Sequence, residues 1–425
     1  MASLSRKLFA NPFYRVGSLQ IMMFYAGWGI WWSFFQIWLT TEQKFTGSQV
    51  GIIYSCDSAV AMILMFAYGI IQDRLGLKRN LLYFLVGLEI LLGPFFTWVY
   101  VPMLNANFYF GAVVGAIYLG AAYLAASPLY EAFVERYGRR YNYAYGQARA
   151  WGSFGYAISA LCAGFLFTIS PYLLYWCGTC VAALLMIVLL KCKPENNAEL
   201  SKRYAITFSS TTGAVPSFKD MAHVFGMGDV WKIIIFVVMS WTFYTVFDQQ
   251  MFPEFFTRFF DTPAQGQQAY GVLNSIEVFL EFFMMGIMPI VMYKIGIRRS
   301  VLLGMCIMVV RIGGCGLVTN PVGVGAIKLL HAPETAIYAL AVFRYLTLHF
   351  DTRLSATIYM VAFQIAAQLG QIVFSTPLGT LRDSIGYQST FLVISGIAFC
   401  AGTYAFFMLK KDDQDVNGQP LSENG

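Results

Sequence analysis

Charged residues are scarce in this chain. Only 12% of its 425 residues are Asp, Glu, Lys or Arg, whereas 58% are hydrophobic and 17% are aromatic. An ordinary soluble domain is about 25% charged, so a soluble protein of this composition could not cover its surface with polar groups. The net charge of +6 does not indicate nucleic-acid binding, because the basic residues are spread over short segments between apolar runs. The composition therefore favours an integral membrane protein.

Motifs of several enzyme classes are also absent. The sequence has no G-x-x-x-x-G-K-[ST] loop, which leaves ATP-driven pumping unsupported. It has no H-E-x-x-H or G-x-S-x-G either, so an intramembrane hydrolase would lack its catalytic groups. Cys177 and Cys180 form a C-x-x-C inside an apolar run with no His or acid nearby, which favours packing over a metal or redox site. We expect no enzyme activity, no metal and no cofactor.

Long apolar runs, by contrast, are abundant. A helix that crosses a bilayer needs roughly 20 mainly apolar residues. The first run is too long for the core of a cleavable signal peptide. The predicted spans are residues 16–39, 51–72, 81–100, 108–130, 146–169, 172–190, 231–256, 270–293, 301–318, 324–345, 355–378 and 390–409. The sequence therefore predicts an all-α integral membrane protein with twelve transmembrane helices.

The spans fall into two sets of six. The predicted parts are an N-terminal six-helix bundle (residues 1–190), a cytoplasmic middle loop (191–230), a C-terminal six-helix bundle (231–410) and a disordered cytoplasmic tail (411–425). A gapless internal repeat supports this division, because residues 50–79 align with residues 270–299. The alignment pairs Gly51 with Gly271 and Asp57 with Glu277. It links the second span to the eighth, as a duplication of six spans requires.

Basic residues indicate the orientation in the membrane. They cluster in alternate connecting segments, whereas the other connecting segments hold little beyond Lys44, Arg258 and Arg382. Because Lys and Arg accumulate in cytoplasmic loops, both termini are predicted to be cytoplasmic. An even number of spans also requires both termini to lie on the same side of the membrane.

Charged residues inside the spans are numerous. They are Asp57, Glu89, Glu131, Arg149, Asp248, Glu277, Glu281, Arg311, Lys328, His331 and Glu334. A charge at the bilayer centre costs at least about 2.5–3.5 kcal/mol on insertion scales, so each needs a partner or a water-filled cavity. Glu89 is the single charged residue of the third span, and we expect it to form a structural ion pair or to lie at the lipid edge. The whole set excludes a mere anchor or scaffold.

Lys328, His331 and Glu334 form the sharpest pattern. At spacings of three residues they lie within an arc of about 120° on one helix. A buried carboxyl group holds its proton to higher pH than an exposed one, and imidazole titrates near neutral pH. The group therefore suits proton coupling, although a salt-bridged helix face is the alternative.

Glu131 and Arg149 flank the short connection between the fourth and fifth spans. A carboxylate and a guanidinium presented together can bind neighbouring sugar hydroxyls. Trp151 and Tyr156 offer flat faces that suit the C–H face of a pyranose ring. The alternative is an ion pair at helix ends with packing aromatics. The tryptophans of the first span are assigned to the lipid belt or the core.

The segment after the second span reads as a conformational latch on the cytoplasmic side. Its residues are Gly69, Asp73, Arg74, Gly76, Lys78 and Arg79. Gly76 permits a tight turn, Asp73 can cap or pair with a neighbouring helix end, and the basic residues fix the orientation.

This latch resembles the signature of the major facilitator superfamily. Residues 247–250 (FDQQ), 328–334 (KLLHAPE) and 148–152 (ARAWG) resemble segments of the oligosaccharide:proton symporters within that superfamily. The resemblance covers nearly the whole chain. It implies two six-helix bundles around a central cavity, and transport of a sugar together with a proton.

Details resemble the sucrose-transporting branch of this family. They are residues 28–33 (WGIWWS) and 150–156 (AWGSFGY). The lactose-transporting branch has Trp where this chain has Tyr156. That branch also has an Asp and a Lys where this chain has Thr245 and Arg344.

The resemblance also implies roles for single residues. Glu131 and Arg149 would bind sugar, His331 would link the sugar and proton sites, Glu334 would carry the proton, Arg311 would tune it, and Asp248 would pair with Lys328. The acid of the eighth helix is either Glu277, one residue from the aligned position, or Glu281, which matches the sucrose branch better. Asp57 is not implied by the family, and we expect it to line the sugar cavity.

Together these observations predict proton-coupled uptake of a disaccharide, with sucrose as first choice, by a monomer in the bacterial inner membrane. Lactose, melibiose, raffinose and maltose remain alternative substrates, and sodium an alternative coupling ion. An uncoupled facilitator would not need the Lys328, His331 and Glu334 group. A membrane sensor should carry a signalling domain, and none is visible.

Overall fold

The computed structural model describes residues 9–205, 218–351, 354–413 and 416, and every regular element in these ranges is a helix. The all-α prediction is confirmed. The N-terminal helices are α2 (Pro12–Ile37), η1 (Trp38–Glu42), α3 (Gly47–Leu75), α4 (Asn80–Ile90), α5 (Leu92–Pro94), η2 (Phe95–Tyr100), α6 (Val101–Ala106), α7 (Phe108–Leu119), η3 (Gly120–Leu124), α8 (Ala126–Arg140), α9 (Tyr145–Ile169) and α10 (Pro171–Lys191).

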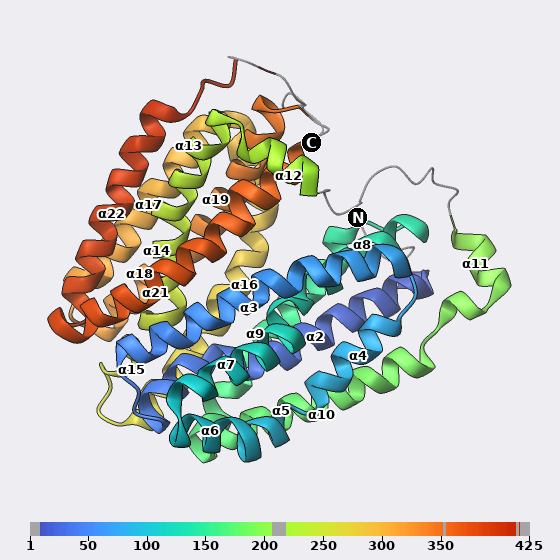
Figure 1. Ribbon diagram of the computed structural model, residues 1–425, viewed down its shortest axis with the longest axis horizontal. Helices are drawn as coiled ribbons and strands as arrows, with labels where there is room; N and C mark the ends of the chain where they lie inside the picture. The colour runs from blue at the N-terminus through green and yellow to red at the C-terminus, as the bar shows by residue number, and fades with distance from the viewer. Residues whose placement is uncertain (1–8, 206–217, 352–353, 414–415, 417–425) are drawn as a thin grey trace. The chain divides into compact units, whose positions relative to one another are not determined.

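The second half of the chain likewise consists of long α-helices with short π-helical segments between them. Its helices are α13 (Gly228–Val237), η5 (Val238–Thr242), α14 (Phe243–Thr245), η6 (Val246–Met251), α15 (Phe252–Thr257), α16 (Pro263–Ile295), α17 (Ile297–Leu317), α18 (Pro321–Lys328), α19 (His331–His349), α20 (Ser355–Tyr359), η7 (Met360–Ile365), α21 (Ala366–Ile385) and α22 (Tyr387–Met408). The predicted middle loop holds three short helices, η4 (Pro194–Asn196), α11 (Ala198–Tyr204) and α12 (Phe218–Phe225) (Figure 1). Most of the predicted tail lies outside the described residues.

Membrane-crossing helices account for most of the fold. In the described part of the chain, ten helices are long and apolar enough to cross a bilayer, and an eleventh crossing results when α4 and the bent continuation to Ala106 count as one. The predicted first span overlaps α2, which is not among the helices just counted. Its 26 residues extend about 39 Å, more than the roughly 30 Å hydrocarbon core. Several helices outrun the predicted apolar runs, because polar helix ends extend beyond the hydrocarbon layer.

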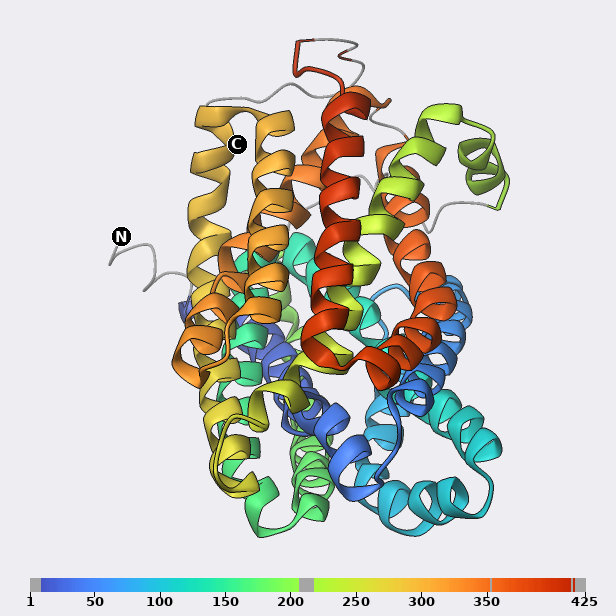
Figure 2. The same cartoon turned by 90° about the vertical axis from the view of Figure 1, so that its left-hand side faces the viewer.

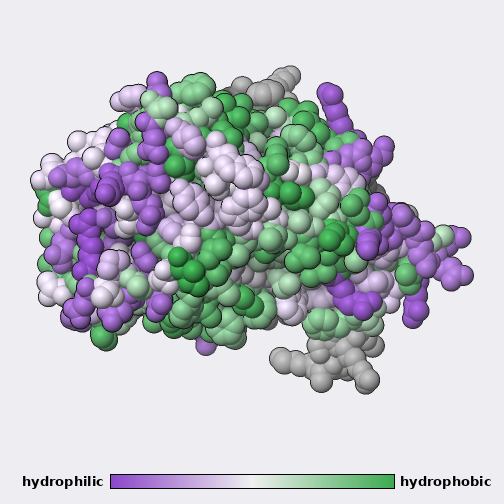
Figure 3. Space-filling view, turned by 90° about the horizontal axis from the view of Figure 1, so that it is seen from below, coloured by the Kyte–Doolittle hydropathy of each residue, from purple (hydrophilic) through white to green (hydrophobic). Residues whose placement is uncertain are grey.

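Large apolar side chains cover much of the surface, as a lipid-facing protein requires. Phe279, Phe283 and Ile290 of α16 are exposed, as is Phe407 near the end of α22. Figure 3 shows broad hydrophobic areas on one face, with hydrophilic residues gathered toward its two sides. Water would strongly disfavour this surface, whereas lipid chains do not.

Two compact units make up the chain. One contains Met1–Phe35 and Val60–Val215, and the other contains Gln36–Ala59 and Pro216–Gly425. The first division falls inside α2 and the second inside α3, so one end of each helix packs with the C-terminal half of the chain. Within the second unit α17 and α22 run side by side (Figures 1 and 2).

Hydrogen bonds explain why Gln36–Ala59 joins the second unit. The buried Gln36 amide donates to the Glu254 carboxylate, and Gln36 accepts a hydrogen bond from the Glu254 backbone at 3.0 Å. Asp383 accepts hydrogen bonds from the amides of Gly47 and Ser48, at 2.8 and 2.9 Å. A carboxylate thus satisfies the first free N–H groups of α3 from 336 residues away.

The predicted latch is an anchor between helix ends. Gly76 has φ +60, a conformation that favours glycine. Arg79 is buried, donates to the carbonyls of Leu189 and Cys192 at the end of α10, and pairs with Glu195 at 2.7 Å. Lys78 and Arg74 are both exposed. The side chain of Asp73 lies outside what the structure describes.

The second half has an equivalent anchor, which supports the internal repeat. Gly296 has φ +89. The amides of Ile297 and Arg298 donate to Asp412, which follows α22, at 2.7 and 3.0 Å, and the Arg298 guanidinium donates to the Phe406 carbonyl. In both halves the turn after a long helix therefore binds the end of that half's last helix. The arginine that binds the helix end is Arg79 in the first half and Arg298 in the second, one position before the residue that aligns with Arg79.

Replacing Arg79 tests the anchor. Arg79→Ala leaves two helix-end carbonyls without a donor and Glu195 without its partner, a loss of about 2–4 kcal/mol for a largely buried group. We expect a clear fall in the unfolding temperature of the purified protein in detergent. Arg74→Ala, at an exposed position in the same turn, is the control and should change it little. Equal stability of the two variants would contradict the anchoring role.

Candidate functional site: two clusters of charged residues

Five helices of the second unit bring six ionisable residues together. They are Asp248 on η6, Glu277 on α16, Arg311 on α17, Lys328 at the end of α18, and His331 and Glu334 at the start of α19. All but Asp248 are less than a tenth exposed. The sequence predicted five of these contributors as a proton-coupling group and Glu277 as one of two candidate acids.

The predicted arc of Lys328, His331 and Glu334 lies at a break in the helix. Lys328 ends α18 and His331 begins α19. Pro333 has no amide hydrogen to donate to the Leu329 carbonyl, which explains the interruption. The three residues nevertheless belong to one membrane-crossing helix, Pro321–His349, with a tight turn at Leu329 and Leu330.

Arg311 is the centre of the cluster. Its guanidinium binds both oxygens of Glu334, with Nε to Oε2 at 2.5 Å and Nη2 to Oε1 at 3.1 Å. Its remaining nitrogen Nη1 donates to Asp248 Oδ1 at 2.9 Å. Arg311 and Glu334 are fully buried, so this two-atom pair is formed away from water.

Lys328 and His331 connect two further carboxylates. The ammonium of Lys328 lies 2.5 Å from Asp248 Oδ1 and 3.1 Å from Glu277 Oε2. His331 places Nδ1 3.3 Å from Asp248 and Nε2 3.0 Å from Glu277. The hydroxyl of Tyr244 lies 3.2 Å from His331 Nδ1. Tyr244 was not predicted from the sequence, since a Tyr in an aromatic span gives no distinct signal.

Charge counting shows what this cluster can do. Three carboxylates face two permanent cations, so the cluster has room for one further positive charge, supplied by a proton on His331 or on a carboxyl group. Asp248, Glu277 and His331 also present ligand atoms within 4.8 Å of one another. The Lys328 ammonium lies against two of these groups and fills the place of a metal cation.

The structure favours Glu277 over Glu281 as the acid of the eighth span. Glu277 is buried and contacts both Lys328 and His331. Glu281 lies four residues further along α16, is partly exposed and interacts electrostatically with Tyr244.

The first unit holds the second cluster. Arg149 Nε lies 2.6 Å from Glu131 Oε1, and both side chains are about a third exposed, at 31% and 34%. Tyr25 of α2 donates to the same oxygen at 2.6 Å, and the Arg149 guanidinium lies 4.2 Å from the centre of its ring. Ser153, one turn along α9, accepts a hydrogen bond from Arg149 Nη1 at 3.2 Å. The predicted pair therefore exists, and Tyr25 and Ser153 are additions.

The two aromatic residues predicted to bind sugar lie on different faces of α9. Tyr156 follows Arg149 by seven residues, on the same face, and its ring lies against Gly29 of α2, where a side chain would meet it. Trp151 points to another face. Its Nε1 donates to the Tyr14 hydroxyl at 2.9 Å, and its ring packs edge-on against Phe154. Trp151 thus packs α9 against α2, contrary to the expectation that it offers a face to sugar.

Asp57 is buried in the second unit. Its side chain is 1% exposed, and in the described part of the chain neither carboxylate oxygen has a hydrogen-bond partner. The next residue, Ser58, donates to Gln371 of α21 at 3.4 Å.

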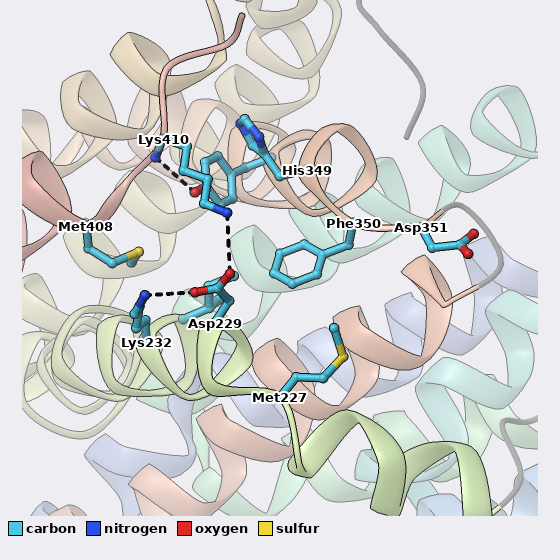
Figure 4. A pocket seen from close by; sticks show the side chains of 10 residues that line it. Met227, Asp229, Lys232, His349, Phe350, Asp351, Met408 and Lys410 are labelled. Carbon is cyan, nitrogen blue, oxygen red and sulfur yellow. Dashed lines mark hydrogen bonds and ion pairs between the residues drawn. The ribbon is translucent and has the colours of Figure 1, made fainter. Parts of the chain in front are cut away.

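A separate cavity of about 410 Å³ lies at one end of the second unit. Figure 4 shows Asp229 between Lys232 and Lys410, which it pairs with at 2.7 and 3.3 Å. The pair with Lys410 joins the start of α13 to the segment after α22, whereas the pair with Lys232 lies within α13. The cavity is distinct from both clusters and was not predicted.

Two solved structures have the same fold as this chain. The chain matches the nucleoside transporter NupG with a TM-score of 0.78 at 13% identity, over 94% of this chain and 99% of that one. It matches the inward-open xylose transporter XylE from E. coli with a TM-score of 0.63 at 15% identity, over 95% and 97%. At 13% and 15% identity, these likenesses show the shared fold.

Residues 6–419 match the model of the LacY proton/sugar symporter family, and the chain belongs to that family. It is 39% identical to a sucrose permease of Escherichia coli over 414 residues, 97% of this chain and 98% of the relative. It is 34% identical to a raffinose permease of Escherichia coli (88% of each) and to a lactose permease of Klebsiella oxytoca (89% and 90%). The predicted resemblance is confirmed.

Glu277 and Glu281 provide a matched pair for a test. Glu277→Gln removes one carboxylate from Lys328 and His331, and losing a charged hydrogen bond costs about 1.5–3 kcal/mol, or roughly tenfold to a hundredfold. We expect initial sugar uptake to fall by about that factor. Glu281→Gln should stay within about twofold of wild type. The reverse order would show that Glu281 is the functional acid.

Proposed function

We propose that this symporter takes up a disaccharide, with sucrose as first choice, together with a proton. The observation that carries the proposal is the buried pair between Arg311 and Glu334 within a cluster that lacks one positive charge. A proton on Glu334 would cancel the attraction to Arg311 and leave Arg311 with Asp248. Proton binding and rearrangement of the cluster are then one event.

The proposed cycle begins with protonation of Glu334 from outside. Sugar then binds between Glu131 and Arg149, whose partly exposed groups can exchange their mutual contact for sugar hydroxyls. Tyr156, on the same face of α9, offers a flat surface to the sugar ring. The two bundles rock, sugar leaves to the inside, and the proton follows. The membrane potential supplies about 2.3 kcal/mol per charge per 100 mV.

The remaining charged residues have supporting roles in this proposal. His331 connects the two ends of the cluster through Asp248 and Glu277. Lys328 pairs with the carboxylates of Asp248 and Glu277. Asp57 is a candidate sugar ligand on α3 because its oxygens have unused hydrogen-bonding capacity in the described structure.

Sucrose is preferred for two reasons. The identity to a sucrose permease is higher than to the raffinose and lactose permeases. The Asp and Lys of the lactose-transporting branch are replaced by Thr245 and Arg344, and the Thr245 hydroxyl donates to the Trp241 carbonyl of its own span at 2.8 Å. We further propose a monomer in the bacterial inner membrane with both termini cytoplasmic, and two functional bundles at residues 1–190 and 231–410.

Sugar-dependent proton uptake tests the function directly. In a lightly buffered suspension of de-energised cells, sucrose should cause alkalinisation with the wild-type protein, because each sugar enters with a proton. Glu334→Gln should abolish it while radiolabelled sucrose still exchanges across the membrane. Lactose, melibiose, raffinose and maltose are tested in parallel, with sodium replaced by potassium in a second series.

Each other outcome contradicts one part of the proposal. Equilibration of sugar without alkalinisation in wild type indicates an uncoupled facilitator. Dependence on sodium indicates a different coupling ion. A response to galactosides alone leaves the mechanism in place and overturns sucrose as the substrate.

A further inference from the structure

The third span is broken beside a buried acid. α4 ends at Ile90, and its continuation from Leu92 is bent by 41°. Pro94 has no amide hydrogen for the Ile90 carbonyl, which explains the break. Tyr118 donates to the Leu88 carbonyl at 2.7 Å, and the same carbonyl accepts from the Leu91 amide at 3.0 Å. Glu89 occupies the last turn of α4, directly at this break.

Glu89 is neither at the lipid edge nor in an ion pair, contrary to both expectations from the sequence. It is 2% exposed. Across residues 9–205 and the other described ranges no cation pairs with it, and its Oε1 makes no hydrogen bond. An unpaired carboxylate inside a protein costs several kcal/mol, whereas a neutral carboxylic acid does not carry that cost. The site therefore accommodates the protonated form.

Phenols from three elements face Glu89. Tyr118 of α7, Tyr123 of η3 and Tyr130 of α8 all interact with it electrostatically. The buried hydroxyl of Tyr130 lies against the Glu89 carboxylate, and that of Tyr123 lies against Trp31. Neither contact has the geometry of a regular hydrogen bond. α10 also packs along α4. Its ionisable side chains within the membrane are thiols and phenols, so it brings no cation.

Neighbouring residues connect this cluster to the sugar site. Tyr130 directly precedes Glu131 on α8. Phe24 of α2 stacks on Tyr130 at 4.2 Å, and the next residue, Tyr25, donates to Glu131 at 2.6 Å. A shift of α8 at Tyr130 is thus also a shift of Glu131 against Tyr25 and Arg149.

Building on the proposed sugar transport, we propose that Glu89 is a second proton-binding carboxyl group. Its protonated form keeps α8 in the position from which Glu131 and Arg149 bind sugar. Loss of the proton places an uncompensated anion among the phenols. The hydroxyls of Tyr123 and Tyr130 then reorient to donate to it, and α8 moves with Tyr130. Glu89 is a positioning residue and does not touch the sugar.

The test is sugar affinity as a function of pH in purified Glu334→Gln protein, which removes the titration of Glu334. With Glu89 present, sucrose affinity should decline at alkaline pH, approaching about tenfold per pH unit once Glu89 loses its proton. Adding Glu89→Gln should abolish the decline, because Gln is a neutral hydrogen-bonding group at every pH. Adding Glu135→Gln, which changes a partly exposed acid of α8 paired with Arg139, should leave the decline unchanged.

Two results overturn the inference: a flat profile with Glu89 present, or a decline that survives Glu89→Gln. Failure of all five disaccharides to bind at any pH would instead overturn the proposed function. A second measurement needs no sugar and no Glu334 variant. The infrared carbonyl band of a protonated carboxylic acid should be present in wild type at neutral pH and reduced in Glu89→Gln. Identical bands in the two proteins also overturn the inference.

Discussion

The buried pair between Arg311 and Glu334 is the interaction on which the rest of the site depends. Removing one partner from such a pair costs about 3–5 kcal/mol, because the other charge is left unpaired in a medium that cannot solvate it. Each of the three nitrogen atoms of the Arg311 guanidinium already donates a hydrogen bond to Glu334 or Asp248. Lys328 and His331 therefore contact Asp248 and Glu277 together, so three carboxylates share the guanidinium, the ammonium and the imidazole.

The pair between Glu131 and Arg149 has the opposite character. Its side chains are about a third exposed, so the Coulomb attraction is screened and the pair is worth little to stability. A weak pair can exchange its partner for a ligand at low cost. The same two types of group therefore lie in different surroundings: one pair is shielded from water, and the other is open to it.

Much of this arrangement was predictable from residue type and spacing. Costly intramembrane charges identified Glu131, Arg149, Asp248, Arg311, Lys328, His331 and Glu334 as a set. Three particulars were not predictable. Glu277 and Glu281 lie one helical turn apart, and only packing decides which of them meets Lys328. Trp151 points away from Arg149 because of its position around α9. Tyr25 is one of several aromatic residues in its span, and only contact distinguishes it.

By itself the sequence determined that this is an all-α membrane transporter with buried charges and a repeated half, because composition, apolar run length and charge placement depend on the solvent around each residue and not on its distant neighbours. The tertiary structure decided which charges meet and that Gln36–Ala59 packs with the second unit. It also decided that Glu89 is enclosed by phenols, with no cation beside it among the residues that the structure describes. Those outcomes depend on side chains converging from helices far apart in the chain, and helical periodicity fixes the face of each helix but not its partner.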